Sequence, residues 1–138
     1  MKIILASKSG VRKKILDQNN IENQVVESNV NEDEVKVSLL AEGASPMLIS
    51  KNLAELKANK VSSKTPDQIV LGADSVIDIG GELISKPKSR DEAFEILQKL
   101  NGKKHQLISS VCISKNGSMI WNYTEAVSYT HLTLPTKA

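Results

Sequence analysis

The chain has 138 residues, enough for one domain or part of one, and its 40% hydrophobic but only 3% aromatic composition predicts an aliphatic core. Its 18 basic and 16 acidic residues leave a net charge of +2, which argues against a general binder of nucleic-acid polymers or membrane surfaces. The single cysteine, Cys112, excludes an internal disulfide and a cysteine-based zinc site, and the absence of a targeting or membrane-spanning sequence predicts a cytoplasmic protein.

The first informative segment is an apolar strand over residues 2–6 that leads through a small polar loop into a helix over residues 11–19. Backbone N–H groups without partners and the helix dipole make the start of a helix electropositive. Ser7, Ser9 and Arg12 lie at this point, and hydroxyl and guanidinium groups bind phosphate oxygens. The segment therefore indicates a phosphate site, although an ordinary strand–helix unit with solvated cations fits these residues equally well.

The elements that follow alternate between strands and helices at first and then become rich in strands. In the first half we expect a strand at 24–27, a polar loop at 28–34, a helix from 35 to 40 that Gly43 ends, and a helix opened by Ser45-Pro46. A turn at 65–67 then leads to a strand at 68–71 and to a hairpin at 76–84 around Gly80-Gly81. The last elements are a helix from the Ser89–Glu92 capping box to Leu100 and two strands, at 107–113 and 119–127, joined by a turn at 115–118. This order predicts an α/β fold in which helices flank a mixed, twisted β-sheet.

Helical spacing predicts which side chains face the core. The expected inward positions are Val11, Ile15 and Leu16 in the first helix, Ile49, Leu53 and Leu56 in the helix after Ser45, and Ala93, Ile96, Leu97 and Leu100 in the last helix. Lys57 lies one step off the second of these stripes, at its border. Cys112 lies in an apolar strand, where a buried and unreactive thiol is expected.

Two further segments place polar side chains next to apolar strands. The apolar run that begins at Ile69 ends in Asp74, and open α/β sheets bind their ligands at the carboxyl ends of strands. Lys86-Pro87 follows the Gly80-Gly81 turn, so a cation precedes a residue whose backbone angle φ is fixed. Both segments add charged groups to the candidate phosphate site.

Taken together, these segments resemble the Maf family of nucleotide pyrophosphatases. The matching residues occur in the order of the family pattern: Ser7-Lys8-Ser9, Arg12, Lys57-Ala58, Gly72-Ala73-Asp74-Ser75, Lys86-Pro87 and Asn101-Gly102-Lys103-Lys104-His105. Each motif alone is unspecific, whereas the ordered set is specific and extends over about residues 1–127. The resemblance implies the same fold class as the element order, a mixed sheet with flanking helices.

Residues 128–138 depart from the family pattern. They have no helical period and do not resemble the carboxy-terminal segment of the family, so we expect a non-native tail that adds little stability. Residues 1–127 would then form a partial Maf-like domain. Its second lobe, which helps to close the nucleotide pocket in the family, would be incomplete.

The resemblance implies hydrolysis of a nucleoside triphosphate between its α- and β-phosphates, which releases a nucleoside monophosphate and pyrophosphate and removes unwanted or modified nucleotides. This reaction needs positive charge at the phosphates, a divalent cation and a carboxylate that activates water. The candidate roles are general base for Asp74, binding of Mg²⁺ or Mn²⁺ for Glu32 and Asp74, and phosphate binding for Ser7, Ser9, Arg12, Lys57 and Lys86. The expected partner is the nucleotide substrate, with no nucleic-acid polymer and no membrane, and a homodimer is left open.

Simpler roles compete with several of these assignments. Asp74 could cap a turn, Arg12 could be a solvated helix residue, and Asp33 or Glu34 could take the place of Glu32. Two further positions, Val11 and Ser75, differ between branches of the family. Ser75 is close to the threonine of the branch that acts on dTTP and UTP, whereas Val11 favours the branch that acts on 7-methyl-GTP. The choice between these substrates therefore stays open.

Two other functions are also open. The chain could bind nucleotides without turnover, as a regulator of cell division or septum formation, or it could be an inactive fragment. Binding requires only the cations and the N–H donors, whereas turnover also requires the carboxylate of Asp74. This residue therefore separates the enzyme from the regulator.

Overall fold

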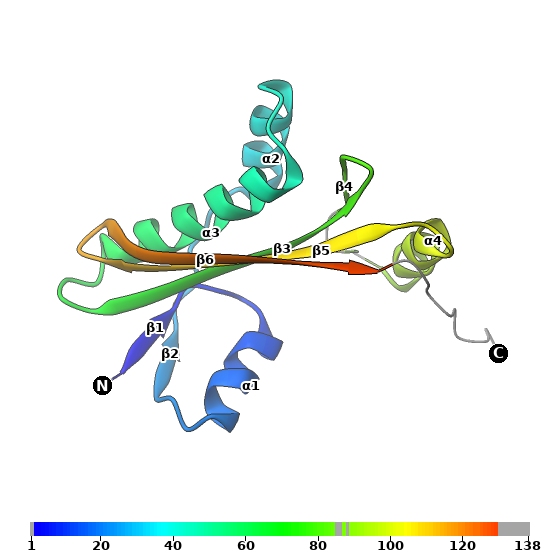
Figure 1. Ribbon diagram of the computed structural model, residues 1–138. Helices are drawn as coiled ribbons and strands as arrows, with labels where there is room; N and C mark the ends of the chain where they lie inside the picture. The colour runs from blue at the N-terminus through cyan, green and yellow to red at the C-terminus, as the bar shows by residue number, and fades with distance from the viewer. Residues whose placement is uncertain (1, 85–86, 88, 130–138) are drawn as a thin grey trace.

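The computed structural model describes residues 2–84, 87 and 89–129 (Figure 1). The sheet has six strands: β1 (Ile3–Leu5), β2 (Asn23–Val25), β3 (Ile69–Ile79), β4 (Glu82–Ile84), β5 (His105–Lys115) and β6 (Ser118–Tyr129). The helices are α1 (Gly10–Gln18), α2 (Glu32–Ala41), α3 (Pro46–Ser62) and α4 (Arg90–Leu100). The expected α/β fold with a mixed sheet and flanking helices is confirmed.

The strand order is β2-β1-β3-β5-β6, and β4 pairs with β3 off this path. Strand β1 is parallel to β2 and β3, whereas β5 is antiparallel to β3 and β6, and β4 is antiparallel to β3. One edge of β3 pairs with β5 from Val70 to Asp78. On the other edge, β1 pairs with residues 69–71 and β4 with residues 77–79. Among the described strands, none pairs with this second edge over residues 72–76, so the sheet has a gap there.

Helix α3 covers one face of the sheet, and α1 lies on the other side (Figure 1). Ser45 caps α3 by accepting a hydrogen bond from Leu48 N, and Pro46 follows in the first turn, which confirms the expected start of this helix. The buried core cluster between α3 and the sheet is aliphatic and small: Ile4, Ala6, Ala54, Ala58, Val61, Val70 and Cys112. The expected burial of the Cys112 thiol is thus confirmed as well.

Some of the expected inward positions are wrong. In α1, Val11 is 69% exposed and Ile15 is 52% exposed, and no residue of this helix is buried. The reason is that α1 packs mainly against the short strand β2 and does not cover the sheet. In α3, Ile49 and Leu53 are buried, but Lys57 takes the next place on the buried face and Leu56 is exposed.

In α4 only Leu100 is fully buried, whereas the other three expected positions, Ala93, Ile96 and Leu97, are half-buried. This helix lies at the end of the sheet beyond β5 and does not lie flat on it (Figure 1). The expected cap by Ser89 is confirmed, since its Oγ accepts from Glu92 N. No helix in the described part of the chain is long and apolar enough to cross a membrane.

Several element boundaries also differ from the expectation. Residues 28–34 are not all loop, because Asn31 caps α2 and the helix begins at Glu32. Strand β3 does not stop at Leu71 but runs unbroken to Ile79, since β5 pairs along nearly its whole length. Strand β6 continues two residues beyond Val127, with Ser128 opposite Gln106 and Tyr129 stacked on His105. The rest of the expected tail, residues 130–138, lies outside the described residues.

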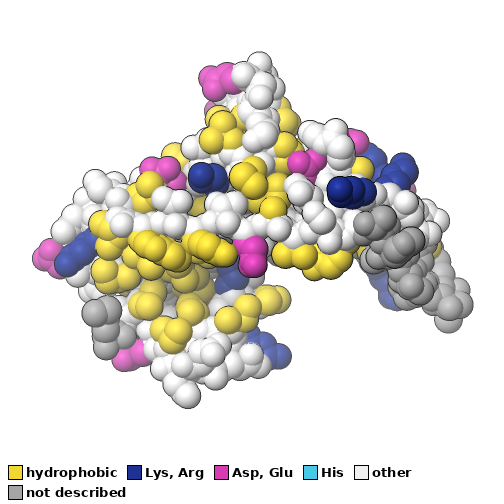
Figure 2. Space-filling view, in the orientation of Figure 1, with side chains coloured by type: hydrophobic (Ala, Val, Ile, Leu, Met, Phe, Trp, Pro, Cys, Tyr) yellow, Lys and Arg dark blue, Asp and Glu magenta, His cyan; other side chains and the backbone are white. Residues whose placement is uncertain are grey.

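Side chains on the face of β5 and β6 opposite α3 are largely exposed. They include Leu107, Trp121, Tyr123 and Val127, and the rings of Trp121 and Tyr123 stack with their centroids 6.2 Å apart. Figure 2 shows hydrophobic side chains gathered along the underside of the sheet. The two faces are therefore covered unequally.

Candidate active site

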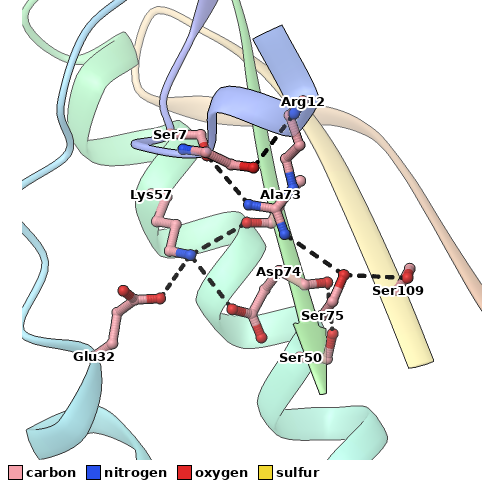
Figure 3. A network of polar contacts seen from close by, with 10 residues as sticks. Ser7, Arg12, Glu32, Ser50, Lys57, Ala73, Asp74, Ser75 and Ser109 are labelled. Carbon is pink, nitrogen blue, oxygen red and sulfur yellow. Dashed lines mark hydrogen bonds and ion pairs between the residues drawn. The ribbon is translucent and has the colours of Figure 1, made fainter. Parts of the chain in front are cut away.

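The candidate site lies at the gap in the sheet, where Asp74 and Ser75 belong to the part of β3 that pairs with β5 on one edge but with no described strand on the other. Successive side chains of a strand point to opposite faces. Asp74 accordingly lies on the side of α3, and Ser75 on the side reached by Arg12 from α1 (Figure 3). The gap thus joins a carboxylate on one face to a guanidinium on the other.

On the α3 side, one lysine holds two carboxylates. Lys57 Nζ lies 2.6 Å from Glu32 Oε1 and 3.3 Å from Asp74 Oδ1, and it also donates to Ala73 O at 3.2 Å (Figure 3). Lys57 and Asp74 are 7% and 6% exposed, so this ion pair is largely removed from water. The sequence assigned Lys57 to phosphate binding, whereas its contacts in the structure are to the two candidate metal ligands.

Burial raises the pKa of Asp74 above its ordinary value, and the neighbouring Lys57 ammonium opposes this shift without cancelling it. Asp74 Oδ1 accepts from Lys57, but Oδ2 is buried and has no hydrogen-bond partner among the described groups. An unpaired buried carboxylate oxygen is unfavourable unless a ligand completes it. Oδ2 is therefore the atom at which a water, a cation or a substrate group would be bound.

Helix α2 decides which acidic residue reaches the site. Glu32 lies in its first turn and contacts Lys57, whereas Glu34 Oε2 accepts from the cap residue Asn31 at 3.3 Å. A rigid helix start brings only one of its three consecutive acidic residues to a given neighbour. Of Glu32, Asp33 and Glu34, Glu32 contacts the lysine that also holds Asp74, and its role as a metal ligand stays a prediction.

On the other face, Arg12 joins the first loop to β3. Its Nη1 donates to Ser7 Oγ at 3.1 Å and its Nη2 to Ser75 Oγ at 3.5 Å (Figure 3). Ser9 caps α1 by accepting from Arg12 N at 3.3 Å, and Ser9 N donates to Ser7 Oγ. Hydroxyl groups, a guanidinium and a helix start therefore meet, which is a suitable environment for an anion.

One described candidate residue, Val11, does not join this constellation. The side chain of Val11 is exposed on α1, and no hydrogen-bonding group of the site depends on it. Lys86 lies outside the described residues, so its assignment stays a prediction.

Sequence reasoning missed three residues near the site. Ser50 Oγ donates to Asp74 O at 3.2 Å, and Ser109 Oγ lies 3.2 Å from Ser75 Oγ. Lys36 lies one turn after Glu32 on α2, and its charge acts on the Asp74 carboxyl group. The i, i+4 spacing of Glu32 and Lys36 was readable in the sequence, but nothing marked the two serines.

The carboxylates suit a hard divalent cation. Mg²⁺ prefers oxygen ligands and uses one or two carboxylates together with waters and substrate phosphates. Glu32 and Asp74 meet at one ammonium, and Asp74 Oδ2 has no other partner. The described residues contain no group of three or more His, Cys, Asp or Glu that could form a metal site by themselves. A cation held here would therefore share its coordination with a phosphate ligand.

Solved structures support the fold. The structure of a nucleoside-triphosphatase / dITP/XTP pyrophosphatase from Mycobacterium abscessus matches all of this chain and 78% of its own, with a TM-score of 0.62 and 13% identity. A HAM1 protein from Coxiella burnetii matches 94% of this chain and 71% of its own, with a TM-score of 0.58 and 15% identity. At these identities the likeness concerns the fold alone.

Curated relatives are much closer in sequence. A protein named nucleoside triphosphate pyrophosphatase from Pelagibacter ubique (strain HTCC1062) is 69% identical over 128 residues, which are 93% of this chain and 66% of that protein. A protein named 7-methyl-GTP pyrophosphatase from Brucella abortus biovar 1 (strain 9-941) is 37% identical over 134 residues, 97% of this chain and 66% of its own length. The chain thus spans slightly less than two thirds of these relatives.

A family profile also matches the chain. The profile described as "Maf-like protein" matches residues 2–136, nearly the whole chain. The match includes the segments that carry Ser7, Arg12, Lys57 and Asp74, which the fold assembles around one gap in the sheet. By this match and the order of its motifs, the chain belongs to the Maf family.

Proposed function

We propose that this protein is a nucleoside triphosphate pyrophosphatase, which hydrolyses the α–β phosphate bond and releases a nucleoside monophosphate and pyrophosphate. The observation that carries the proposal is the buried Asp74 carboxylate, which lies across one gap of the sheet from the Arg12 and Ser7 anion site. Relatives with this activity in their names are up to 69% identical to this chain.

The anion site binds the phosphates. Arg12 already points its two Nη groups at Ser7 and Ser75, and a phosphate oxygen can replace either hydroxyl as its acceptor. Ser9 holds the start of α1 in place by accepting from Arg12 N, and the partial positive charge of a helix start favours an anion there. Lys86 adds a further positive charge by the family resemblance.

The carboxylate side activates water. Asp74 Oδ2 is free to accept a proton from a water, and its raised pKa makes the carboxylate a better base than an exposed aspartate. Glu32 and Asp74 would hold Mg²⁺ or Mn²⁺, which when bound neutralises the phosphate oxygens and orients them. Lys57 keeps the two carboxylates together and offsets part of their mutual repulsion.

The alternative of a regulator without turnover differs only in what Asp74 does. A pure binder has no need of a buried carboxylate with a free oxygen beside a phosphate site, and burial of such a group is unfavourable.

The preference for one nucleotide base stays open. Relatives are named both for nucleoside triphosphates and for 7-methyl-GTP, and Ser75 contacts Arg12 whereas Val11 is exposed.

The proposal is tested by measuring pyrophosphate release from UTP, dTTP and 7-methyl-GTP with Mg²⁺ or Mn²⁺, and after chelation. We expect turnover that chelation stops and either metal restores. A chimera that continues after Val127 with the corresponding part of the Pelagibacter relative is measured beside the 138-residue chain. An inactive chain with an active chimera would identify the chain as an inactive fragment. A chimera that binds nucleotides without hydrolysis would support the regulator.

Replacement of Arg12 by alanine should weaken binding of all triphosphates. A charge-assisted hydrogen bond contributes about 1.5–3 kcal/mol, so we expect KM to rise roughly ten- to one-hundredfold. The matched control is Lys13→Ala, because Lys13 lies on the same helix but contacts Asp17 and Asn23 away from the site. Equal KM values for Arg12→Ala and the unmodified protein would remove Arg12 from the phosphate site.

A further inference from the structure

Ser50 is a fully buried polar side chain that contacts β3, the strand that carries Asp74. It lies on α3 with 0% exposure, and its Oγ donates to the backbone oxygen of Asp74 at 3.2 Å (Figure 3). The contact joins residues 24 positions apart in the chain. A buried hydroxyl in a helix usually turns back to a carbonyl of its own helix, whereas this one reaches across to the strand that carries the candidate base.

Two side chains of α3 hold the backbone of β3 beside the gap in the sheet. Over residues 72–76 the second edge of β3 has no partner among the described strands. Ala73 O faces this second edge, as Leu71 O does toward β1, and it accepts from Lys57, whereas Asp74 O points to the opposite edge, where β5 pairs, and accepts from Ser50. Ser50 and Lys57 are seven residues, or about two turns, apart and therefore share one face of the helix.

The direction of the Asp74 carboxylate depends on the backbone that Ser50 holds. Lys57 fixes only one oxygen, Oδ1, and its ammonium is shared with Glu32 at a shorter distance. Oδ2 has no partner, so its position follows from the backbone at Asp74 and from the tether at Oδ1. A shift of the backbone would therefore move the oxygen that is available for water or a cation.

We propose that Ser50 is a positioning residue for catalysis, whose hydroxyl holds the Asp74 carbonyl and thereby aims Asp74 Oδ2 into the site. This inference rests on the proposed hydrolysis, in which Asp74 is the base. Ser50 itself does not touch the substrate. Its loss should affect the rate of the chemical step more than the binding of the nucleotide.

Ser62 provides a matched control on the same helix. It is also buried, at 1% exposure, and its Oγ accepts from Gly117 N at 2.9 Å, near the turn between β5 and β6. Ser50→Ala and Ser62→Ala each remove one hydroxyl with one interelement hydrogen bond. If Ser50 were only structural, the two variants would behave alike.

Steady-state kinetics of both variants form the first part of the test. A misplacement of 1 Å can lower a rate about a hundredfold, so a displacement of about half an ångström should lower kcat roughly tenfold. We expect this loss in Ser50→Ala with KM within about twofold, an unchanged kcat in Ser62→Ala, and recovery in Ser50→Thr, which keeps the hydroxyl. If the additional methyl group prevents folding of the threonine variant, Ser50→Cys fills the space without a strong donor and should match Ser50→Ala.

Backbone amide hydrogen exchange over residues 72–76 forms the second part and needs no turnover. It should be faster in Ser50→Ala than in the unmodified chain, and unchanged in Ser62→Ala. Unaltered exchange at 72–76, or equal kcat values for Ser50→Ala and Ser62→Ala, would overturn the positioning role. Faster exchange in a protein that hydrolyses none of the triphosphates would instead reject the proposed function and retain the contact as a backbone clamp.

Discussion

Replacement of Asp74 by asparagine is expected to abolish most turnover while nucleotide affinity changes by no more than a few fold. Asparagine keeps the size of the side chain but lacks the charge and the basic lone pair that accept a proton from water. A positioned general base contributes about 10²- to 10⁴-fold to a rate, and we expect a loss in kcat of this size. The measurement is pyrophosphate release together with equilibrium binding of the same triphosphates.

Asp78→Asn is the control for this substitution. Asp78 lies on the same strand, but its Oδ1 accepts from Gly81 N at 2.7 Å in the turn that leads to β4. We expect this variant to retain its turnover. If Asp74→Asn keeps nearly full activity, Asp74 is not the base, and Glu32 becomes the candidate because it shares the Lys57 ammonium.

The same residue predicts an unusual pH dependence of stability. Burial raises the pKa of Asp74 above its unfolded value of 3.8, so in the interval between the two values the folded chain binds more protons than the unfolded chain. The contribution of Asp74 to the free energy of unfolding therefore falls as the pH rises through this interval, and turnover rises as the carboxylate forms. Asp74→Asn should remove this contribution and leave the unfolding midpoint at neutral pH equal or higher. A markedly lower midpoint would mean that the ion pair with Lys57 outweighs the burial of the charge.

Replacement of Gly72 by alanine is expected to produce the largest loss of stability. A Cβ atom at this position would collide with the backbone oxygen of Ala54 and would lie 2.8 Å from Ala58 N, and helical backbone cannot turn aside as a flexible side chain can. Overpacking by one methyl group costs about 1–3 kcal/mol, which corresponds to a decrease in Tm of roughly 5–15 °C. Because α3 must move away from β3, the contact between Lys57 and Asp74 should also lengthen and kcat should fall.

Gly10→Ala is the matched glycine control, measured by thermal unfolding under the same conditions. Gly10 is the first residue of α1, and a Cβ atom there would meet nothing within 4 Å. Alanine favours the helix and restricts the unfolded chain, so we expect equal or slightly higher stability. If Gly72→Ala unfolds at the same temperature as Gly10→Ala, the close approach of α3 to β3 is not required for the fold.

The sequence by itself determined those features that depend on neighbouring residues. Ser45-Pro46 and Ser89 begin helices because a cap is completed within three residues, and Gly80-Gly81 forms a hairpin turn because both residues adopt positive φ angles. The ordered motifs around Ser7, Lys57 and Asp74 also identified the family, since their order does not depend on the tertiary arrangement. Fold class, most element positions and the family were therefore accessible before the structure.

Only the tertiary structure decided which groups meet. The pairing of Lys57 with both Glu32 and Asp74 depends on how α2 and α3 dock, and neither spacing nor composition encodes that orientation. Ser50 carries no motif, and its contact with the backbone of Asp74 exists because α3 packs on the face of β3 that carries Asp74. The exposure of Val11 was likewise decided by the tertiary structure. An amphipathic pattern indicates which face of a helix is apolar, but the packing of α1 against a short strand leaves this face uncovered.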